Sequence, residues 1–94
     1  MPVQITVEET PTGDHFECRV LVDEGSSRTE HTVRVENSYR DQLVGPHISP
    51  AHLVRKSFEF LLEREPKESI LRSFDLRVIS RYFPEYEKEI RKRL

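Results

Sequence analysis

Apolar and polar side chains alternate along three stretches in the first part of the chain. Alternation with a period of two is typical of strands that bury one face and leave the other in water. The polar segments T-P-T-G-D and D-E-G-S-S separate the stretches and predict turns. We therefore expect residues 1–36 to form a three-stranded antiparallel β-meander with one inward face. The side chains expected on that face are Val3, Ile5, Val7, Phe16, Cys18, Val20, Val22, Thr29, His31, Val33 and Val35.

The spacing becomes helical after a linker at residues 37–49, which we expect to hold one helical turn around residues 39–43. Ser49 followed by Pro50 is a combination favoured at helix starts, so the main helix is predicted from residue 50 to about Glu65. Its apolar side chains spread over about 200°, wider than the ~100° stripe of a helix packed on one side only. We expect this helix to contact the sheet on one side and later helices or another subunit on the other.

Two prolines divide the rest of the chain. Pro66 and Pro84 each end one helix and suit the first turn of the next, because proline lacks the N–H group that an interior helical position donates. Asp75 is a predicted N-cap between them. The expected fold is α+β, with the meander followed by one longer and two or three short helices packed on one face. In this prediction residues 1–94 form a single small domain, which comprises the meander (1–36), the linker (37–49) and a helical part (50–94).

The final segment, Y-F-P-E-Y-E-K-E-I-R-K-R-L, places its acidic residues first and its basic residues last. Two interpretations are open: a cationic arm for nucleic acid, or a stable terminal helix. Acidic residues in the first turn and basic residues in the last turn interact favourably with the helix dipole, and each such charge stabilises the helix by ~0.3 to 1 kcal/mol. Glu87 with Arg91 and Glu89 with Arg93 also form i,i+4 pairs in the better orientation. Helix stability accounts for the whole segment, so we favour the terminal helix.

Charge is divided unevenly along the 94 residues, although the net charge is only −2. Residues 1–49 carry net −5 and residues 50–94 carry net +3. A total so close to zero gives no general attraction to phosphate. The single cysteine excludes an intramolecular disulfide, and neither an apolar run nor a signal-like start suggests a membrane or export. We expect a cytoplasmic protein without membrane association.

The sequence contains no recognised catalytic, metal-binding or cofactor-binding motif. His47 and His52 flank Pro50, which turns the chain between them, so we predict no metal site. Cys18 lies among apolar strand residues, where burial raises the pKa of a thiol and makes it unreactive. The sequence has no phosphate-binding loop, dinucleotide fingerprint or nucleophile elbow. We expect no catalytic residue and no cofactor, and an enzyme without a recognisable motif is the least favoured interpretation.

Residues 58–87 contain F-D-L followed by Y-F-P-E-Y, and this segment resembles the C-terminal halves of short uncharacterised prokaryotic proteins. The resemblance implies a prokaryotic cytosolic protein. It lends no catalytic residue and no function, because the function of that family is not known. Helix boundaries and core aromatic residues already account for the motif.

Two binding functions follow as hypotheses. The first is a non-catalytic protein-interaction or small regulatory module that binds another protein or a second copy of itself, and it rests on the broad apolar arc of the main helix. Its candidate contacts are Phe60, Tyr82, Phe83 and Tyr86. The alternative is nucleic-acid binding through a helical basic patch. The candidate contacts of that patch are Arg72, Arg77, Arg81, Arg91, Lys92 and Arg93.

Overall fold

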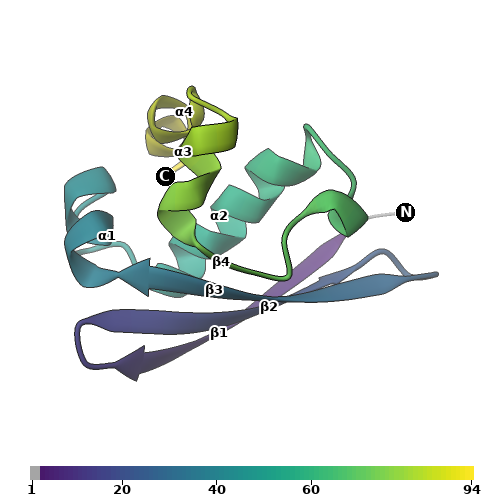
Figure 1. The fold of residues 1–94 in the computed structure, drawn as a ribbon, viewed down its shortest axis with the longest axis horizontal. Coiled ribbons are helices and arrows are strands. Elements are labelled where there is room, and N and C mark those ends of the chain that lie inside the picture. Colours follow the sequence, from purple (N-terminus) through teal and green to yellow (C-terminus); the bar gives the residue numbers. More distant parts are fainter. Residues whose placement is uncertain (1–2) are drawn as a thin grey trace.

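The computed structural model describes residues 3–94 and has an α+β fold, with the helices gathered on one face of a mixed sheet (Figure 1). The sheet has four strands in the order β1-β2-β3-β4. The strands are β1 (Gln4–Thr12), β2 (His15–Asp23), β3 (Arg28–Glu36) and β4 (Ser73–Asp75). The longer helices are α1 (Asn37–Leu43), α2 (Pro50–Leu62) and α4 (Tyr86–Arg93), and the short ones are η1 (Lys67–Ser69), η2 (Leu76–Val78) and α3 (Ile79–Tyr82).

The first three strands form the predicted antiparallel meander. Thr12 pairs with His15 across a two-residue turn in which Gly13 has a φ of 68°, a conformation that glycine adopts without strain. The predicted turn T-P-T-G-D is therefore too long, because Pro11 and Thr12 belong to the strand. An edge strand accepts proline since the missing N–H group would point into solvent.

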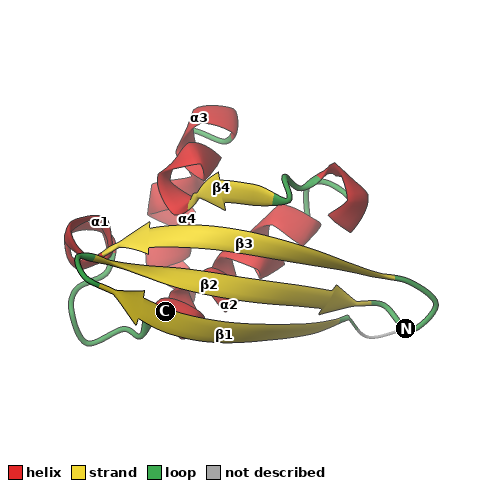
Figure 2. Cartoon of the chain, turned by 60° about the horizontal axis from the view of Figure 1, so that its bottom comes forward, coloured by secondary structure: helices red, strands yellow, loops and turns green. Residues whose placement is uncertain are grey.

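A fourth strand was not predicted, and the expectation of a three-stranded sheet is corrected here. Strand β4 pairs with β3 in parallel, with Val33 opposite Phe74 (Figure 2). The N–H group of Thr32 donates to the main-chain oxygen of Arg72 at 2.7 Å. Three residues are too few to show an alternating pattern, so the sequence gives no signal for this strand. Its pairing depends on the tertiary contacts that bring the segment back to β3.

The helix starts follow the predicted signals. Ser49 caps α2, where its hydroxyl accepts from the N–H group of His52 at 3.1 Å, and a carboxylate oxygen of Asp75 accepts from the N–H group of Arg77 at 3.1 Å. Several boundaries differ from the prediction. Pro66 precedes only the three-residue η1, and α4 begins at Tyr86, two residues after Pro84. The linker contains the complete helix α1, and α2 ends at Leu62 rather than near Glu65.

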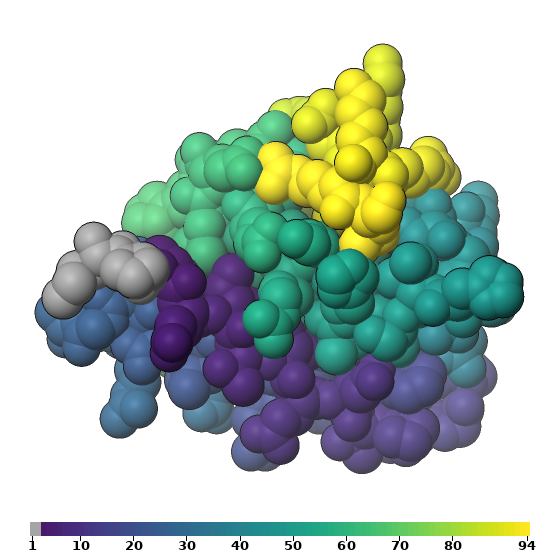
Figure 3. Space-filling view, turned by 180° about the vertical axis from the view of Figure 1, so that it is seen from behind, coloured from purple at the N-terminus to yellow at the C-terminus, as the bar shows by residue number. Residues whose placement is uncertain are grey.

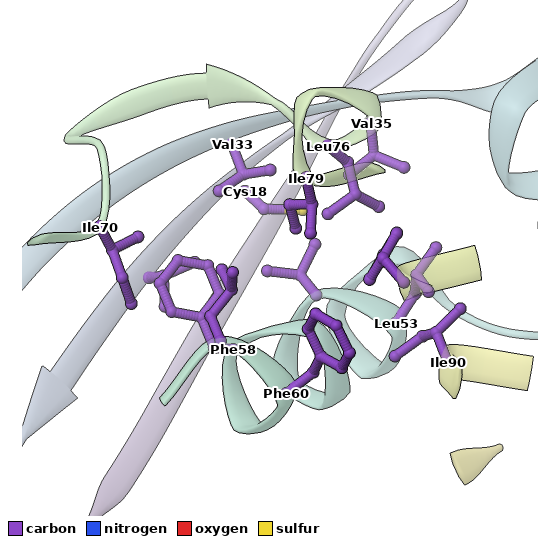
Figure 4. Close-up of a cluster of buried hydrophobic side chains, with 14 of the residues drawn as sticks. Cys18, Val33, Val35, Leu53, Phe58, Phe60, Ile70, Leu76, Ile79 and Ile90 are labelled. Atoms are coloured by element: carbon purple, nitrogen blue, oxygen red, sulfur yellow. The ribbon is translucent and has the colours of Figure 1, made fainter. Parts of the chain in front are cut away.

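One apolar core joins the two parts of the chain (Figure 4). The sheet contributes its inward valines and Cys18, and the helices cover them with fully buried residues such as Leu53, Phe58, Phe60 and Ile90. Helix α2 has the two predicted neighbours, because it packs on β1 and β2 with one side and on α4 with the other. The C-terminal residues, yellow in the space-filling view, rest directly against the middle of the chain (Figure 3). The broad apolar arc of α2 is thus covered within the monomer.

None of the helices in residues 3–94 combines the length and the apolar character that a bilayer crossing requires.

Candidate functional site

An open apolar groove of ≈ 430 Å³ lies between the end of α2, the segment from η1 to β4, and the helical segment of η2 and α3. We call it the 65–82 groove. Its volume falls in the usual range of ~300 to 1,000 Å³ for ligand sites, and its walls are mainly aliphatic and aromatic, as in such sites. Its apolar walls come from Leu61, Ile70, Leu71, Phe74, Val78 and Phe83.

Two large apolar side chains of the groove are strongly exposed. Tyr82 is 68% exposed and Leu71 is 48% exposed, and the only comparable residue within 3–94 is Val3 at 40%. Tyr82 ends α3, a helix of four residues, so few neighbours surround its ring. Apolar side chains that lie side by side in water mark surfaces suited to contact with another molecule.

Glu65 is the single acidic residue of the groove, and it has no hydrogen-bonding or ionic side-chain partner within residues 3–94. Burial against the apolar walls raises the pKa of its carboxyl group. Every other acidic side chain of residues 50–94 has a partner, which sets Glu65 apart. The partnered carboxylates are Glu59, Glu63, Glu68, Asp75, Glu85, Glu87 and Glu89.

A buried histidine fixes the position of Leu71 in the groove. Nδ1 of His31 lies 2.7 Å from the main-chain oxygen of Leu71, and Nε2 lies 2.8 Å from the hydroxyl oxygen of Thr29. A neutral ring satisfies both contacts, with Nδ1–H donating to the carbonyl and Nε2 accepting from the hydroxyl. Burial lowers the pKa of His31, which favours this neutral form. The ring also packs against Phe58, with 5.2 Å between the ring centroids.

A buried lysine holds the start of the same segment. The side chain of Lys67 is 2% exposed, and its ammonium group donates to carboxylates of Glu24 and Glu68 and to the hydroxyl of Ser27 at 2.7 Å. Hydrogen bonds to Glu24, and then to Glu68, raise the pKa of Lys67. The cluster ties η1 to the turn between β2 and β3. The groove is therefore built on a segment that is fastened at Lys67 and again at Leu71.

The predicted protein-contact residues divide into two pairs. Tyr82 and Phe83 line the 65–82 groove. Phe60 and Tyr86 are fully buried, and the expectation that they contact a partner directly is corrected, since they offer no surface. They meet each other in the core at 5.4 Å between ring centroids because α4 closes over α2.

The predicted basic patch is largely used in contacts within the chain. Arg77 pairs with Glu36, Arg93 makes two hydrogen bonds with Glu63, and Arg91 donates to the carbonyl oxygen of Leu43. Lys92 lies 3.7 Å from Glu89. Of the six residues, Arg72 and Arg81 are the two whose side chains make no hydrogen bond or ion pair within residues 3–94. The structure does not gather the six charges into a free cationic surface.

A second hollow, between α1, α3 and α4, is lined mainly by polar and charged side chains. Two pairs of these groups interact: the hydroxyl of Tyr39 donates to Glu87 at 2.9 Å, and Arg77 binds Glu36. Burial, and then the hydrogen bond to Glu87, raises the pKa of Tyr39. A nucleophile beside an unpaired base would be the signature of covalent catalysis, and the described residues of this hollow do not form one.

Cys18 lies on the inward face of β2 with no exposed surface. Burial raises the pKa of its thiol to about 12, with a smaller contribution from Glu9. A thiol with such a pKa is protonated at neutral pH and is a poor nucleophile. Within residues 3–94 no group of three metal-binding side chains converges.

Sequence reasoning found Tyr82 and Phe83 but missed Leu71 and Glu65. Leu71 follows the expected pattern of a short helix, yet it lies in an extended segment beside β4. Glu65 precedes Pro66 in a charged run, E-R-E-P-K-E, where nothing marks it as different from its neighbours. Only the tertiary arrangement shows which acid has no partner.

Comparison of the chain with protein-family models, curated proteins and solved structures gives no match. The resemblance of residues 58–87 to short prokaryotic proteins therefore stays a prediction.

Proposed function

We propose that this chain is a non-catalytic protein-interaction module whose 65–82 groove binds an apolar segment of a partner protein that carries a lysine or an arginine. The observation that supports it most directly is Glu65, an acid without a partner in an otherwise apolar groove. In the sequence, the broad apolar arc of α2 was the reason to expect an interaction function. Helix α4 covers that arc in the structure, so the proposal is based on the groove instead.

The apolar part of the proposed partner follows from the exposed side chains. Contact with a partner removes Tyr82 and Leu71 from water, and ~25 cal/mol is gained per Å² of apolar surface that is buried. A tyrosine beside a well-formed hollow is typical of the few residues that dominate binding energy in protein interfaces. The segment beneath is held by Lys67 and by the His31–Leu71 contact, so little ordering is needed when a partner binds.

The cationic part of the proposed partner follows from Glu65. A partner that is apolar throughout would bury this carboxylate without a counter-charge, which costs free energy. A lysine or arginine at the matching position would instead pair with it in a surrounding of low dielectric constant, where the attraction exceeds that of an exposed pair. The groove therefore selects a cation within an apolar segment.

Nucleic-acid binding is less well supported. Arg77 and Arg93 are already paired with the carboxylates of Glu36 and Glu63, which partly offset their charges within the chain. Tyr82 is the one strongly exposed aromatic ring of residues 3–94, and stacking of successive bases needs several rings on one surface.

Affinity capture with matched baits tests the proposed function. The wild-type chain, a groove variant (Leu71→Ser with Tyr82→Ser) and a control variant (Val3→Ser) are immobilised, and nuclease-treated native lysate is passed over each. Val3 is the matched control because it is exposed and apolar but lies outside the groove. We expect proteins that bind the wild type and the control, that fail to bind the groove variant, and that bind Glu65→Gln more weakly. Two results would contradict the proposal: proteins that are captured only from lysate without nuclease treatment, or proteins that the groove variant captures as well as the wild type does.

A further inference from the structure

Strand β1 is an open edge of the sheet over its whole length. It pairs with β2 along nine residues, and no described residue pairs with its other side. The pairing with β2 runs without a bulge, and β1 contains no lysine, so two common means of blocking an edge are missing. Its one proline, Pro11, lies near the end of the strand.

The register shows which main-chain groups are free. Thr12 and His15 flank the two-residue turn and form a hydrogen-bonded pair, and such pairs alternate along an antiparallel ladder. The N–H and C=O groups of the even-numbered residues therefore point to β2, and those of Ile5, Val7 and Glu9 point outward. The same odd-numbered side chains face the helices, because Glu9 reaches the N–H group of Ala51.

The inward side chains of β1 are incompletely covered. Ile5 and Val7 pack against the core but are only half-buried, whereas Val20 and Val22 opposite them in β2 are fully buried. The difference arises because no strand formed by residues 3–94 lies beyond β1. A further strand along this edge would complete the burial of Ile5 and Val7.

Helix α2 lies along β1 in the opposite direction. Its first turn meets Glu9, where the N–H group of Ala51 donates to Oε2 at 3.2 Å, and Arg55 and Glu59 border a hollow with residues 3–6. Arg55 and Glu59 are one helical turn apart on α2, and both lie beside residues 3–6 at this edge of the sheet.

We propose that the chain forms a two-fold symmetric dimer in which the β1 strands of two copies pair antiparallel about Thr6, and Arg55 of each copy pairs with Glu59 of the other. A two-fold interface uses the same surface twice, so the surface must complement itself. Arg55 and Glu59 meet this condition, since they carry opposite charges one helical turn apart beside the open edge, and a two-fold axis at this edge turns the Arg55 of one copy toward the Glu59 of the other. Arg55 has no ionic partner within the described chain, and Glu59 has only Lys56 at 3.4 Å.

The choice of Thr6 as the centre follows from the side chains of β1. In this register Ile5 lies opposite Val7 of the partner subunit, so the two half-buried apolar residues cover each other. Glu8 then lies opposite Gln4 of the partner subunit. A register centred on Glu8 would instead place two like charges directly opposite, which destabilises a strand pair. The proposal is independent of the 65–82 groove, whose lining residues come from other elements.

Sedimentation equilibrium of charge variants tests the dimer. We expect the wild-type chain to associate to a dimer, and Arg55→Glu or Glu59→Arg to raise its dissociation constant about tenfold, because two attractive pairs become two repulsive ones. An equal mixture of the two single variants restores attraction in a mixed dimer. The double variant Arg55→Glu with Glu59→Arg also restores self-association. Arg81→Glu is the control, since this exposed arginine lies away from β1, and it leaves the constant unchanged.

A main-chain variant tests the strand pairing separately. Val7→Pro removes an N–H group that points outward and makes no bond to β2, so the folded monomer keeps its sheet and its circular dichroism spectrum. The dimer loses a hydrogen bond on each side of the two-fold axis, and the dissociation constant rises. A wild-type chain that stays monomeric at all concentrations overturns the proposal. So does a dimer that neither Val7→Pro nor the charge variants weaken.

Discussion

Nδ1 of His31 lies 2.7 Å from the main-chain oxygen of Leu71, and this contact joins an inner strand of the sheet to the 65–82 groove. The two residues are 40 positions apart in the sequence. Because Leu71 is one of the two most exposed apolar residues of the groove, this hydrogen bond anchors the proposed binding surface to the core of the sheet.

The free energy of unfolding should decrease as the pH falls below ~6.5, the usual pKa of histidine. Burial lowers the pKa of His31 in the folded chain, so the unfolded chain takes up the proton at a higher pH and is stabilised by it. The stability is fully present above ~6.5 and is lost between that pH and the lower folded pKa. Urea denaturation between about pH 7.5 and about pH 5.5 measures the effect.

The His31→Gln variant is the comparison for this titration. It lacks the imidazole, so the difference in unfolding free energy between wild type and variant should shrink toward acidic pH. Carboxylates contribute equally to both chains and cancel in the difference. A pH-independent difference would contradict a neutral, buried His31.

Removal of the Ser57 hydroxyl should loosen α4. The hydroxyl of Ser57 donates to the carbonyl oxygen of Leu53 at 2.8 Å and accepts from Tyr86, whose oxygen lies 2.6 Å away. Ser57→Ala leaves the buried Tyr86 hydroxyl without a partner, at a cost of ~1 to 3 kcal/mol in unfolding free energy. Adding Tyr86→Phe should recover part of this loss, because the unsatisfied group is gone. Chemical denaturation of both single variants and the double variant gives the coupling, and additive effects would exclude the hydrogen bond.

Lys67→Met should release the start of the groove segment. The variant leaves the Glu24 and Glu68 carboxylates without their shared cation, and the turn between β2 and β3 loses its connection to η1. We expect faster amide hydrogen exchange at residues 67–72 with little change in α4. Lys88→Met, at an exposed lysine of α4, is the matched control. Equal exchange in both variants would show that Lys67 does not hold the segment.

The thiol of Cys18 should report on global unfolding. Its side chain is fully buried and burial raises its pKa to about 12, so the folded chain offers no reactive thiolate. We expect a thiol reagent to modify the native protein only as fast as the protein unfolds, and to modify it at once in denaturant. Rapid modification of the native chain would mean that the sheet opens locally at β2.

The sequence predicted the elements whose signals are local. Alternation marked the meander, and Ser49 with Pro50 and Asp75 marked helix starts, because capping depends on neighbours along the chain. Strand β4 left no such signal, since Ser73–Asp75 is extended only through its pairing with β3. Long-range pairing of a short segment is a tertiary property.

The candidate site was predicted only in part for the same reason. Tyr82 and Phe83 were selected as aromatic residues of an amphipathic segment, and they line the groove. Phe60 and Tyr86 belong to the same category in sequence, but α4 covers α2 and buries them. Glu65 differs from its neighbours only because every other acidic side chain of residues 50–94 has a hydrogen-bonding or ionic partner. These partners are set by the tertiary fold, so the sequence does not show the difference.

Selection of peptides from a random display library on the immobilised chain tests the binding function of the groove most directly. Counter-selection on the Leu71→Ser, Tyr82→Ser variant removes peptides that bind elsewhere. We predict enriched peptides that combine apolar residues with one lysine or arginine at a constant spacing, and Glu65→Gln should weaken their binding roughly tenfold. Peptides without a basic residue, or equal binding to wild type and Glu65→Gln, would contradict the account.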